Sequence, residues 1–597
     1  MREKILNELS FENVYEHIVK LTEIAPERLS GTEAERRIAR YIKECFDSYG
    51  IDMTIHEVDA YVSFPGESEL IVFEPEKKVI QSQTFAQTKS TSPEGIEADL
   101  VYVGFGDVEA YENVDVRGKI TLAELSYSPP RPEKVRLTTE HGAIAQIQMN
   151  WGLAEHDCLP MGTVKAIWGN PTIDTFPKLP QIPVVGIKRK DGEWLIEKVK
   201  DHRVRVRLRA LSENRWGKIL EPIGRLGGHE EPGRFVIVGG HYDAWGGGVT
   251  CNATGNATVL ELARVFSKNR ESLRRSLLFT FWPGHETGIM EGSTWFVDTF
   301  WDDLNENGVL YLNIDSPGMK EAVEFIATTS PEAYRFHAEL VRELLKYKDV
   351  ERRRLARTGD QSFFGIGVPS IYGRHHHSKE DIERWHGATL GWWYHSQKDT
   401  IDKVDKSLLQ ESLKMHACYA YELANRPRLP FEFVSVAEVF LDRLQTLRAS
   451  GVEFNLDPLI DAANELKDKA ERLDYKGSQL EGMPDVNPGD LDRFNKVLMR
   501  LSRILTSSLG TVSGRWSQDT YGLTALRTPL PGLFPLEQMA RLSTEDGKYK
   551  LLWTQLLRER NRCMNALKEA IRTIDVYLHR KEVGLTEYGG GIEKKRR

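Results

Sequence analysis

The sequence is poor in cysteine, has no long apolar run and shows no excess of one charge. Its 597 residues contain five scattered cysteines: Cys45, Cys158, Cys251, Cys418 and Cys563. An odd, scattered set indicates reduced thiols and excludes a disulfide framework. The longest apolar stretches, such as 235–240 and 277–282, have only the length of a β-strand, which excludes a membrane-spanning helix. The first residues lack an apolar signal core, so we expect a cytoplasmic protein.

The charged residues are balanced and mixed along the chain. There are 80 lysines and arginines against 88 aspartates and glutamates, which gives a net charge of −8. Because binding to phosphate groups requires a basic surface, this balance argues against nucleic acid as the main partner. Hydrophobic residues make up 40% of the chain, enough for several sizeable cores, and the length predicts more than one domain.

The spacing of apolar residues divides the chain into regions of different predicted secondary structure. Residues 11–49 have helical spacing, whereas 60–215 contain short apolar runs broken by proline and glycine, as in a small strand-rich unit. Beyond residue 430 the helical spacing returns, most clearly between Trp553 and Leu578. We therefore expect a discontinuous domain of residues 1–59 and 216–429, an inserted domain of 60–215 and a helical domain of 430–597.

Strands and helices alternate in the second half of the discontinuous domain. The strand candidates are 234–240, 275–282, 309–314 and 368–372, and helical stretches at 257–268 and 331–346 lie between them. This alternation predicts an α/β fold with a mostly parallel mixed sheet flanked by helices. In such sheets ligands bind at the carboxyl ends of the strands.

Side chains of the types that bind metals follow these predicted strands. They are His241, Asp243, Cys251 and Asn252 after the first strand, His285 and Glu286 after the second, Asp315 after the third, and Tyr394 and His395 further on. Imidazole, thiolate and carboxylate are the ligands that zinc prefers, so the pattern predicts a zinc site. Asp243, two residues after His241, is well placed to accept the other N–H of that ring.

These stretches resemble the co-catalytic zinc aminopeptidases and glutamate carboxypeptidases, a family that also contains the non-catalytic transferrin receptor. The matching segments are, in order, 239–245, 252–255, 281–292, 312–315, 359–363 and 394–400. The resemblance implies a zinc exopeptidase-like fold in which residues 60–215 form a protease-associated insert. It also implies that the segment after 430 is a helical dimerisation domain, and therefore that the protein is a homodimer.

The resemblance also implies roles for single residues. By position in the motifs, His241 and Asp315 would bind one metal ion, and Glu286 and His395 would bind another. Tyr394 would donate a hydrogen bond to the developing oxyanion. Asn252 and Asp360 lie in the same motifs, and we expect them, with Asp243, to support the ligands.

Two positions depart from the family pattern. Cys251 stands where the family has a carboxylate that bridges two metal ions, and His285 stands where it has the general-base glutamate. A bridging carboxylate holds two cations about 3.5–4 Å apart with its two oxygens, whereas a thiolate has one sulfur. We therefore also consider a site for one ion, built from His241, Cys251 and Asp315 or from Cys251, Glu286 and His395. An imidazole titrates near 6.5, so His285 remains able to accept a proton at neutral pH, or to become a ligand itself.

Other roles for these residues stay open at this point. Cys251 is either a metal ligand or a small buried hydrophobe, or it pairs with His285 in a metal-free thiolate–imidazole couple. The run His375, His376 and His377 is either an exposed loop or the source of one extra ligand or base. Trp245, Trp392 and Trp393 either pack as core or line a substrate pocket.

The leading interpretation is a homodimeric zinc-dependent hydrolase that cleaves an amide or peptide-like bond in a small molecule or short peptide. One or two zinc ions would serve as cofactor, and neither a nucleic acid nor a membrane is expected as a partner. One alternative is a non-catalytic, receptor-like homologue that keeps the fold and binds through its surface. Another is a single-metal amidohydrolase with a non-peptide substrate.

Overall fold

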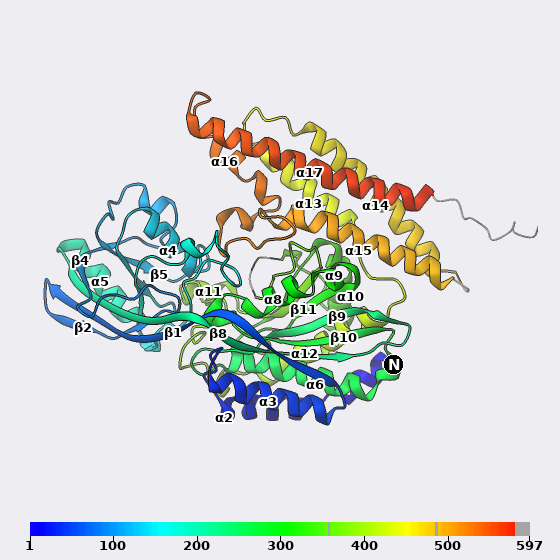
Figure 1. Cartoon of the computed structure of the whole chain (residues 1–597), viewed down its shortest axis with the longest axis horizontal. Helices are drawn as coiled ribbons and strands as arrows, with labels where there is room; N and C mark the ends of the chain where they lie inside the picture. The colour runs from blue at the N-terminus through cyan, green and yellow to red at the C-terminus, as the bar shows by residue number, and fades with distance from the viewer. Residues whose placement is uncertain (356, 358, 484–486, 580–597) are drawn as a thin grey trace, which may run out of the picture.

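The computed structural model describes residues 1–355, 357, 359–483 and 487–579. Figure 1 shows an α/β part at the centre, a smaller part at the left that contains β4 (Ile96–Tyr102) and β5 (Ile120–Glu124), and a layer of long helices above. No helix in the described ranges combines the length and the apolar character needed to cross a membrane.

One large mixed sheet runs through the α/β part and the insert. Its central strands are parallel neighbours in the order β14 (Ser370–His376), β11 (Gly308–Asn313), β9 (Glu231–His241) and β10 (Arg275–Trp282). β8 (Arg205–Leu226) then pairs antiparallel with β10 and with β4, and so joins the sheet of the α/β part to that of the insert. The predicted α/β fold with a mostly parallel mixed sheet is confirmed.

The remaining strands extend both ends of this sheet. They are β1 (Asp52–Glu74), β2 (Lys78–Ile80), β3 (Ser82–Thr84), β6 (Ala145–Met149), β7 (Val184–Ile187), β12 (Glu324–Thr329) and β13 (Arg353–Arg354). β1 pairs antiparallel with β8 along almost its whole length. Each of these two long strands therefore crosses an expected domain boundary, at residues 60 and 215 respectively, and their ladder ties the insert firmly to the α/β part.

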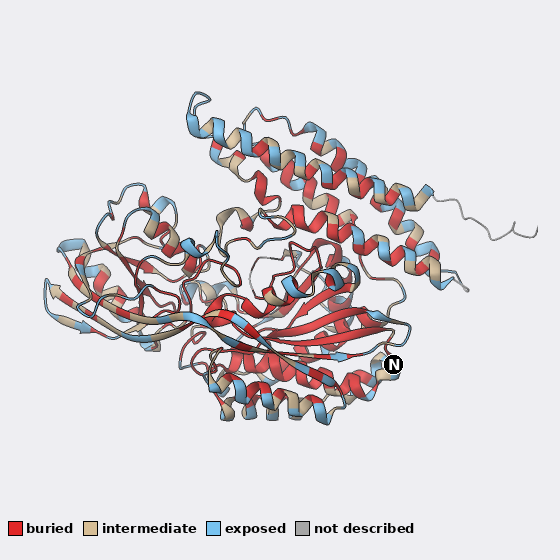
Figure 2. Cartoon of the chain, viewed as in Figure 1, coloured by how far each residue is buried: buried red, intermediate tan, exposed pale blue. Residues whose placement is uncertain are grey.

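Alternate residues of the central strands face opposite layers of helices. Val236 and Val238 of β9 lie in the core beneath the sheet, with α2 (Phe11–Ile24), α3 (Glu33–Ser48), α6 (Thr254–Lys268) and α12 (Lys406–Asn425). Phe235 and Ile237 point to the other face, which α8 (Glu291–Thr299) and α9 (Trp301–Asn307) cover. Because both faces are covered, the central strands are buried along most of their length, as Figure 2 shows.

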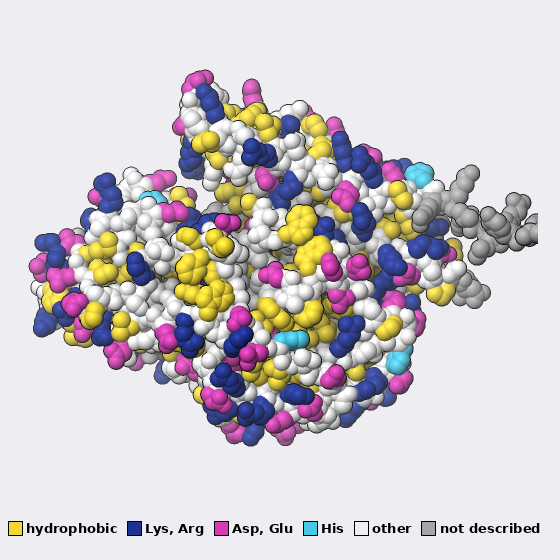
Figure 3. All heavy atoms as spheres, in the orientation of Figure 1, with side chains coloured by type: hydrophobic (Ala, Val, Ile, Leu, Met, Phe, Trp, Pro, Cys, Tyr) yellow, Lys and Arg dark blue, Asp and Glu magenta, His cyan; other side chains and the backbone are white. Residues whose placement is uncertain are grey.

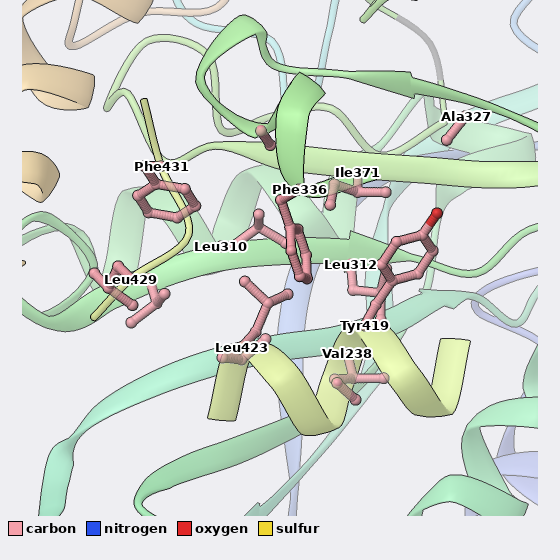
Figure 4. Close-up of a cluster of buried hydrophobic side chains, with 14 of the residues drawn as sticks. Val238, Leu310, Leu312, Ala327, Phe336, Ile371, Tyr419, Leu423, Leu429 and Phe431 are labelled. Carbon is pink, nitrogen blue, oxygen red and sulfur yellow. The ribbon is translucent and has the colours of Figure 1, made fainter. Parts of the chain in front are cut away.

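A close view of the core shows how the helices seal one face of the sheet. In Figure 4, Val238 of β9 and Leu312 of β11 lie beside Tyr419 and Leu423 of α12, and Phe336 of α10 (Tyr334–Leu344) closes the cluster. Burial of such aromatic and aliphatic side chains stabilises the fold by about 1.5–3 kcal/mol each. The strands that carry the candidate ligands are thus held in place by a dense apolar core.

The other helices build the two ends of the molecule. The insert contains α4 (Arg131–Glu140) and α5 (Arg189–Asp201), and the helical module contains α13 (Val434–Arg448), α14 (Asp457–Glu481), α15 (Pro488–Gly510), α16 (Pro535–Met539) and α17 (Gly547–His579). Shorter helices are α1 (Arg2–Glu8), α7 (His285–Gly288) and α11 (Lys379–Arg384). The helix expected over 11–49 is two helices, because Pro26 follows α2 and Gly31 adopts a φ of +83° before α3.

Candidate functional site

Three neighbouring strands bring candidate ligands to one edge of the sheet. His241 is the last residue of β9, Glu286 lies in α7 just after β10, and Asp315 follows β11 by two residues. Because β9 lies between β10 and β11 and runs parallel to both, their carboxyl ends are adjacent. Cys251 reaches the same edge from a short turn (Val249–Ala253) that precedes α6.

The ligand atoms of these residues lie close together. The Cys251 Sγ is 3.5 Å from His241 Nε2 and 3.6 Å from Glu286 Oε1, and ligand atoms of these three residues all lie within 4.8 Å of one another. Asp315 Oδ1 is 3.5 Å from His241 Nε2. His395 Nε2 is 2.7 Å from Glu286 Oε1 and 4.0 Å from the Cys251 sulfur. The structure thus brings all five residues expected to bind metal into one buried cluster.

Hydrogen bonds fix the orientation of the first of these ligands. His241 Nδ1 lies 2.9 Å from the backbone carbonyl of Asp243, which is closer than the Asp243 carboxylate at 3.6 Å. That carboxylate accepts a hydrogen bond from the backbone N–H of Glu286 instead. The Asn252 side chain donates to the carbonyls of His241 and Ile314. Asp243 and Asn252 therefore tie together the loops that carry the ligands.

His285 lies beside this cluster and has a partner of its own. Its Nδ1 is 2.9 Å from Asp360 Oδ2, so the Nδ1–H is donated to that carboxylate and the Nε2 lone pair is free. Burial and the nearby His241 lower the pKa of His285, but Asp360 and Glu286 raise it by more, and the pKa lies above its ordinary value. A histidine oriented by a carboxylate in this way is suited to accept a proton.

Burial and mutual charge set the protonation of the cluster. Burial raises the pKa of the Cys251 thiol well above its ordinary value, and His241 opposes this rise only in part. Burial alone would also raise the pKa of Glu286, but His395 and the other nearby histidines lower it to about 2. Burial lowers the pKa of His395, which is therefore neutral. Glu286 and His395 thus form a carboxylate–imidazole pair.

The donor set fits zinc. His241 Nε2 faces the site, 3.5 Å from both the Cys251 sulfur and Asp315 Oδ1. Nitrogen, sulfur and oxygen donors from three residues match the ligands of catalytic zinc sites. A bound divalent cation also replaces the thiol proton that burial retains on Cys251. His241, Cys251 and Asp315 are therefore the residues that would hold a metal ion.

A cavity of about 320 Å³ opens above the cluster and reaches all three parts of the chain. His285, Glu286, Asp315, Tyr394 and His395 form its floor. Its walls carry side chains that the sequence analysis did not single out: Tyr127, Arg131 and Trp151 from the insert, Arg357, Tyr372 and Arg374 from the α/β part, and Tyr521 and Arg527 from the helical module. These residues are scattered over 400 positions of the chain, and only the packing of the three parts brings them together.

The structure places the other candidates away from this cavity. His375 bonds to Ser412 and Glu411, the His376 ring faces Arg353, and His377 bonds to the carbonyls of Lys320 and Thr389. The tryptophans Trp245, Trp392 and Trp393 do not line it either: Trp393 donates to Thr250, and Trp392 stacks on His156. We therefore do not include these six residues in the proposed site.

Comparisons with known proteins identify relatives of the part of the chain that carries the cluster. Residues 223–420, which run from the end of β8 into α12, match the model of Peptidase family M28. The curated protein named "Probable glutamate carboxypeptidase AMP1" of Arabidopsis thaliana is 24% identical over 598 residues, covering 85% of this chain and 82% of that protein. Aminopeptidase YwaD of Bacillus subtilis is 24% identical over 438 residues, covering 71% of this chain and 87% of the relative.

Solved structures show the same fold. An aminopeptidase from Aneurinibacillus sp. strain AM-1 aligns with a TM-score of 0.53 and 24% identity over 72% of this chain and 97% of its own. A Peptidase M28 precursor from Shewanella amazonensis aligns with a TM-score of 0.58 and 19% identity, over 71% of this chain and 96% of its own. The residues that form the cluster, from His241 to His395, lie within the segment that matches the family model. Residues 223–420 of this chain therefore form a Peptidase family M28 domain.

Proposed function

We propose that this protein is a zinc-dependent hydrolase that cleaves an amide bond in a small, peptide-like substrate that carries a carboxylate. The observation that carries the proposal is a single cavity whose floor holds His285, Glu286, Asp315 and His395, above His241 and Cys251, and whose walls hold arginines. The relatives named as aminopeptidases and glutamate carboxypeptidases support hydrolysis of a peptide-like bond.

Different residues of the cavity have different roles in the proposed hydrolysis. His241, Cys251 and Asp315 would hold zinc, which supplies Lewis acidity to the scissile carbonyl and to water. His285, whose Nδ1–H is donated to Asp360, accepts the proton of the attacking water at Nε2 and later delivers it to the leaving amine. Tyr394 lines the same cavity and donates its hydroxyl hydrogen to the carbonyl oxygen as negative charge develops there.

The arginines of the cavity indicate an anionic substrate. Arg357 is only 7% exposed, and its Nε and Nη1 have no hydrogen-bond partner among the described residues. Arg374 donates to the Tyr372 hydroxyl, but its Nε is likewise without a partner in the described ranges. A buried guanidinium is costly unless an anion accepts its N–H groups. Because a carboxylate accepts two such bonds at once, it is the substrate group that fits this wall.

A substrate panel tests the proposal directly. Purified protein loaded with zinc would be incubated with dipeptides and N-acyl amino acids, each with a free or an amidated terminal carboxylate. We expect hydrolysis of the free-carboxylate compounds, loss of activity with a zinc chelator and recovery when zinc is added back. Hydrolysis of N-acyl compounds alone would favour an amidohydrolase with a non-peptide substrate. Binding without hydrolysis of any compound would favour the non-catalytic, receptor-like alternative.

We further propose that the helical module joins two copies of the chain. Its long helices α14 and α17 expose large apolar side chains: Tyr475 is 68%, Leu551 74% and Val576 65% exposed. On the face drawn in Figure 3, basic and acidic side chains are interspersed with hydrophobic ones. Sedimentation equilibrium would give twice the mass of 68.1 kDa for the parent. Replacing Leu551 and Val576 with Asp would give the single mass if this surface is the interface.

A further inference from the structure

Two histidines of the cluster have opposite hydrogen-bond partners on their far nitrogens. His241 Nδ1 faces the backbone carbonyl of Asp243 at 2.9 Å, and a carbonyl can only accept. In the neutral form of this ring the proton is therefore on Nδ1, and Nε2 faces Cys251 and Asp315. A metal-binding histidine usually donates its other N–H to a carbonyl or carboxylate in just this way.

His395 has the reverse arrangement. Its Nδ1 lies 3.1 Å from Nη2 of Arg131, and a guanidinium can only donate. Nδ1 therefore accepts, the ring proton is on Nε2, and that N–H is donated to Glu286 Oε1 at 2.7 Å. If His395 bound a metal ion through Nε2, its proton would have to be on Nδ1, where it would point at an N–H of Arg131. Two donors would then face each other in a buried site, which is unfavourable.

Arg131 is held in place by the insert. It is the first residue of α4, it donates to the carbonyl of Met161 at 2.7 Å, and the N–H of Met161 donates to the carbonyl of His395 at 2.8 Å. The guanidinium lies against Gly162, where any Cβ would collide with it. The position of Arg131 is thus determined by a specific pocket in the insert, and the same segment also contacts the backbone of His395.

Two ligand-to-ligand distances at His241 suit one ion. A tetrahedral zinc with bonds of about 2.3 Å to sulfur and 2.0–2.1 Å to nitrogen or oxygen separates its ligand atoms by about 3.3–3.6 Å. His241 Nε2 is 3.5 Å from both Cys251 Sγ and Asp315 Oδ1. In contrast, Glu286 Oε1 and His395 Nε2 are 2.7 Å apart, the distance of a direct hydrogen bond.

We propose that this protein binds a single zinc ion, through His241, Cys251 and Asp315, and that Arg131 prevents a second ion from binding by keeping Glu286 and His395 as a hydrogen-bonded pair. The proposal rests on the zinc site of the proposed function and deepens it. Cys251 fits this arrangement because its one sulfur completes the single-ion site, whereas bridging two ions is the task of a carboxylate. Arg131 acts as a positioning residue, through the tautomer of His395.

The test is the metal stoichiometry of the full chain and of two Arg131 variants. Each protein would be stripped with chelator, dialysed against a zinc buffer and analysed by mass spectrometry for bound metal. The Arg131→Gln variant offers an amide oxygen that can accept an Nδ1–H, whereas Arg131→Lys keeps a donor. We expect one equivalent of zinc in the parent and in Arg131→Lys, and two equivalents in Arg131→Gln.

Cobalt provides a second readout that does not depend on activity. In the parent we expect one cobalt ion with a sulfur-to-metal charge-transfer band. In Arg131→Gln we expect a second ion that adds visible absorbance but leaves that band unchanged, because it binds to Glu286 and His395.

Two equivalents in the parent, or one in Arg131→Gln when its circular dichroism and melting match the parent, would overturn the proposal. No bound metal in any of the proteins would instead contradict the proposed function itself. If Arg131→Gln does not fold, Arg131→Met, which neither donates nor accepts, replaces it with the same expectation.

Discussion

The imidazole rings of His241 and His285 lie face to face, with ring centroids 3.9 Å apart and planes within 15° of each other. Each ring is oriented by a different acceptor on Nδ1, the carbonyl of Asp243 for His241 and the carboxylate of Asp360 for His285. Both rings thus present Nε2, rather than Nδ1, to the same edge of the sheet. A positive charge on one ring disfavours a positive charge on the other. We therefore expect one ring to bind the metal ion and the other to accept a proton.

Replacing His285 with Gln tests this division. The variant keeps a polar side chain of similar length but has no group that can take up a proton. We expect kcat to fall by about 10²–10⁴-fold, the usual contribution of a general base, while the zinc content stays at that of the parent. Steady-state kinetics and metal analysis of the same preparation measure both. Loss of zinc together with activity would show that His285 is a ligand rather than a base.

Replacing Cys251 with Ala tests the sulfur ligand. Loss of a residue that supports a ligand weakens metal binding by about 10–100-fold, and we expect loss of a ligand itself to weaken zinc binding by more. Competition with a chromophoric chelator gives the affinity. Cys418→Ala is the matched control, since Cys418 is equally buried but lies in α12. Equal zinc affinities for the two variants would remove Cys251 from the metal site.

The carboxylate-binding role of Arg357 predicts an effect on KM. Charged hydrogen bonds contribute about 1.5–3 kcal/mol, so Arg357→Met is expected to raise KM for a free-carboxylate substrate by about 10–100-fold. The amidated form of the same substrate serves as the internal control, because it lacks the charge that Arg357 would bind. A similar rise in KM for both forms would mean that Arg357 acts only on the shape of the cavity.

A fully buried ion pair next to the site predicts a stability effect. Lys165 of the insert donates to Glu291 at 3.2 Å and to the carbonyl of Gly288, and both side chains are inaccessible to solvent. Removing one partner of such a pair typically costs about 3–5 kcal/mol, because a charge is left buried alone. We expect Lys165→Met to be destabilised by this amount in denaturant unfolding. The double variant Lys165→Met/Glu291→Leu is expected to recover most of the loss; no recovery would show that Lys165 is needed for more than charge balance.

Lys134 predicts a dependence of stability on pH. Burial lowers its pKa to about 7, although its ammonium group donates to Ser126 and to the carbonyl of Phe105. Between pH 7 and about 10.5, the ordinary pKa of lysine, the unfolded chain holds a proton that the folded chain has released. The contribution of Lys134 to the free energy of unfolding therefore rises with pH in that window, by at most about 1.4 kcal/mol per unit. Melting temperatures of the parent and Lys134→Met at several pH values would show a difference that grows with pH. A constant difference would mean that Lys134 keeps its charge.

The sequence by itself was sufficient to predict the strands that precede the candidate ligands. The strand expected at 275–282 matches β10 residue for residue, and those expected at 234–240 and 309–314 lie within about three residues of β9 and β11 at each end. Local periodicity determines such elements, because alternation in a strand or spacing of three and four in a helix depends on near neighbours in the chain. Since adjacent parallel strands end at one edge, the meeting of His241, Glu286 and Asp315 could also be predicted.

Only the tertiary structure decided what surrounds these ligands. Arg131 lies 264 residues before His395 in the chain, and no sequence pattern connects them. The wall formed by Arg357, Arg374 and Arg527 likewise comes from two parts of the chain that meet only in the folded protein. The ligand types are local information, but which nitrogen of a histidine carries its proton depends on the donor or acceptor that packing places beside it. For that physical reason the sequence names the candidate metal ligands, and the fold determines the hydrogen-bond partner of each.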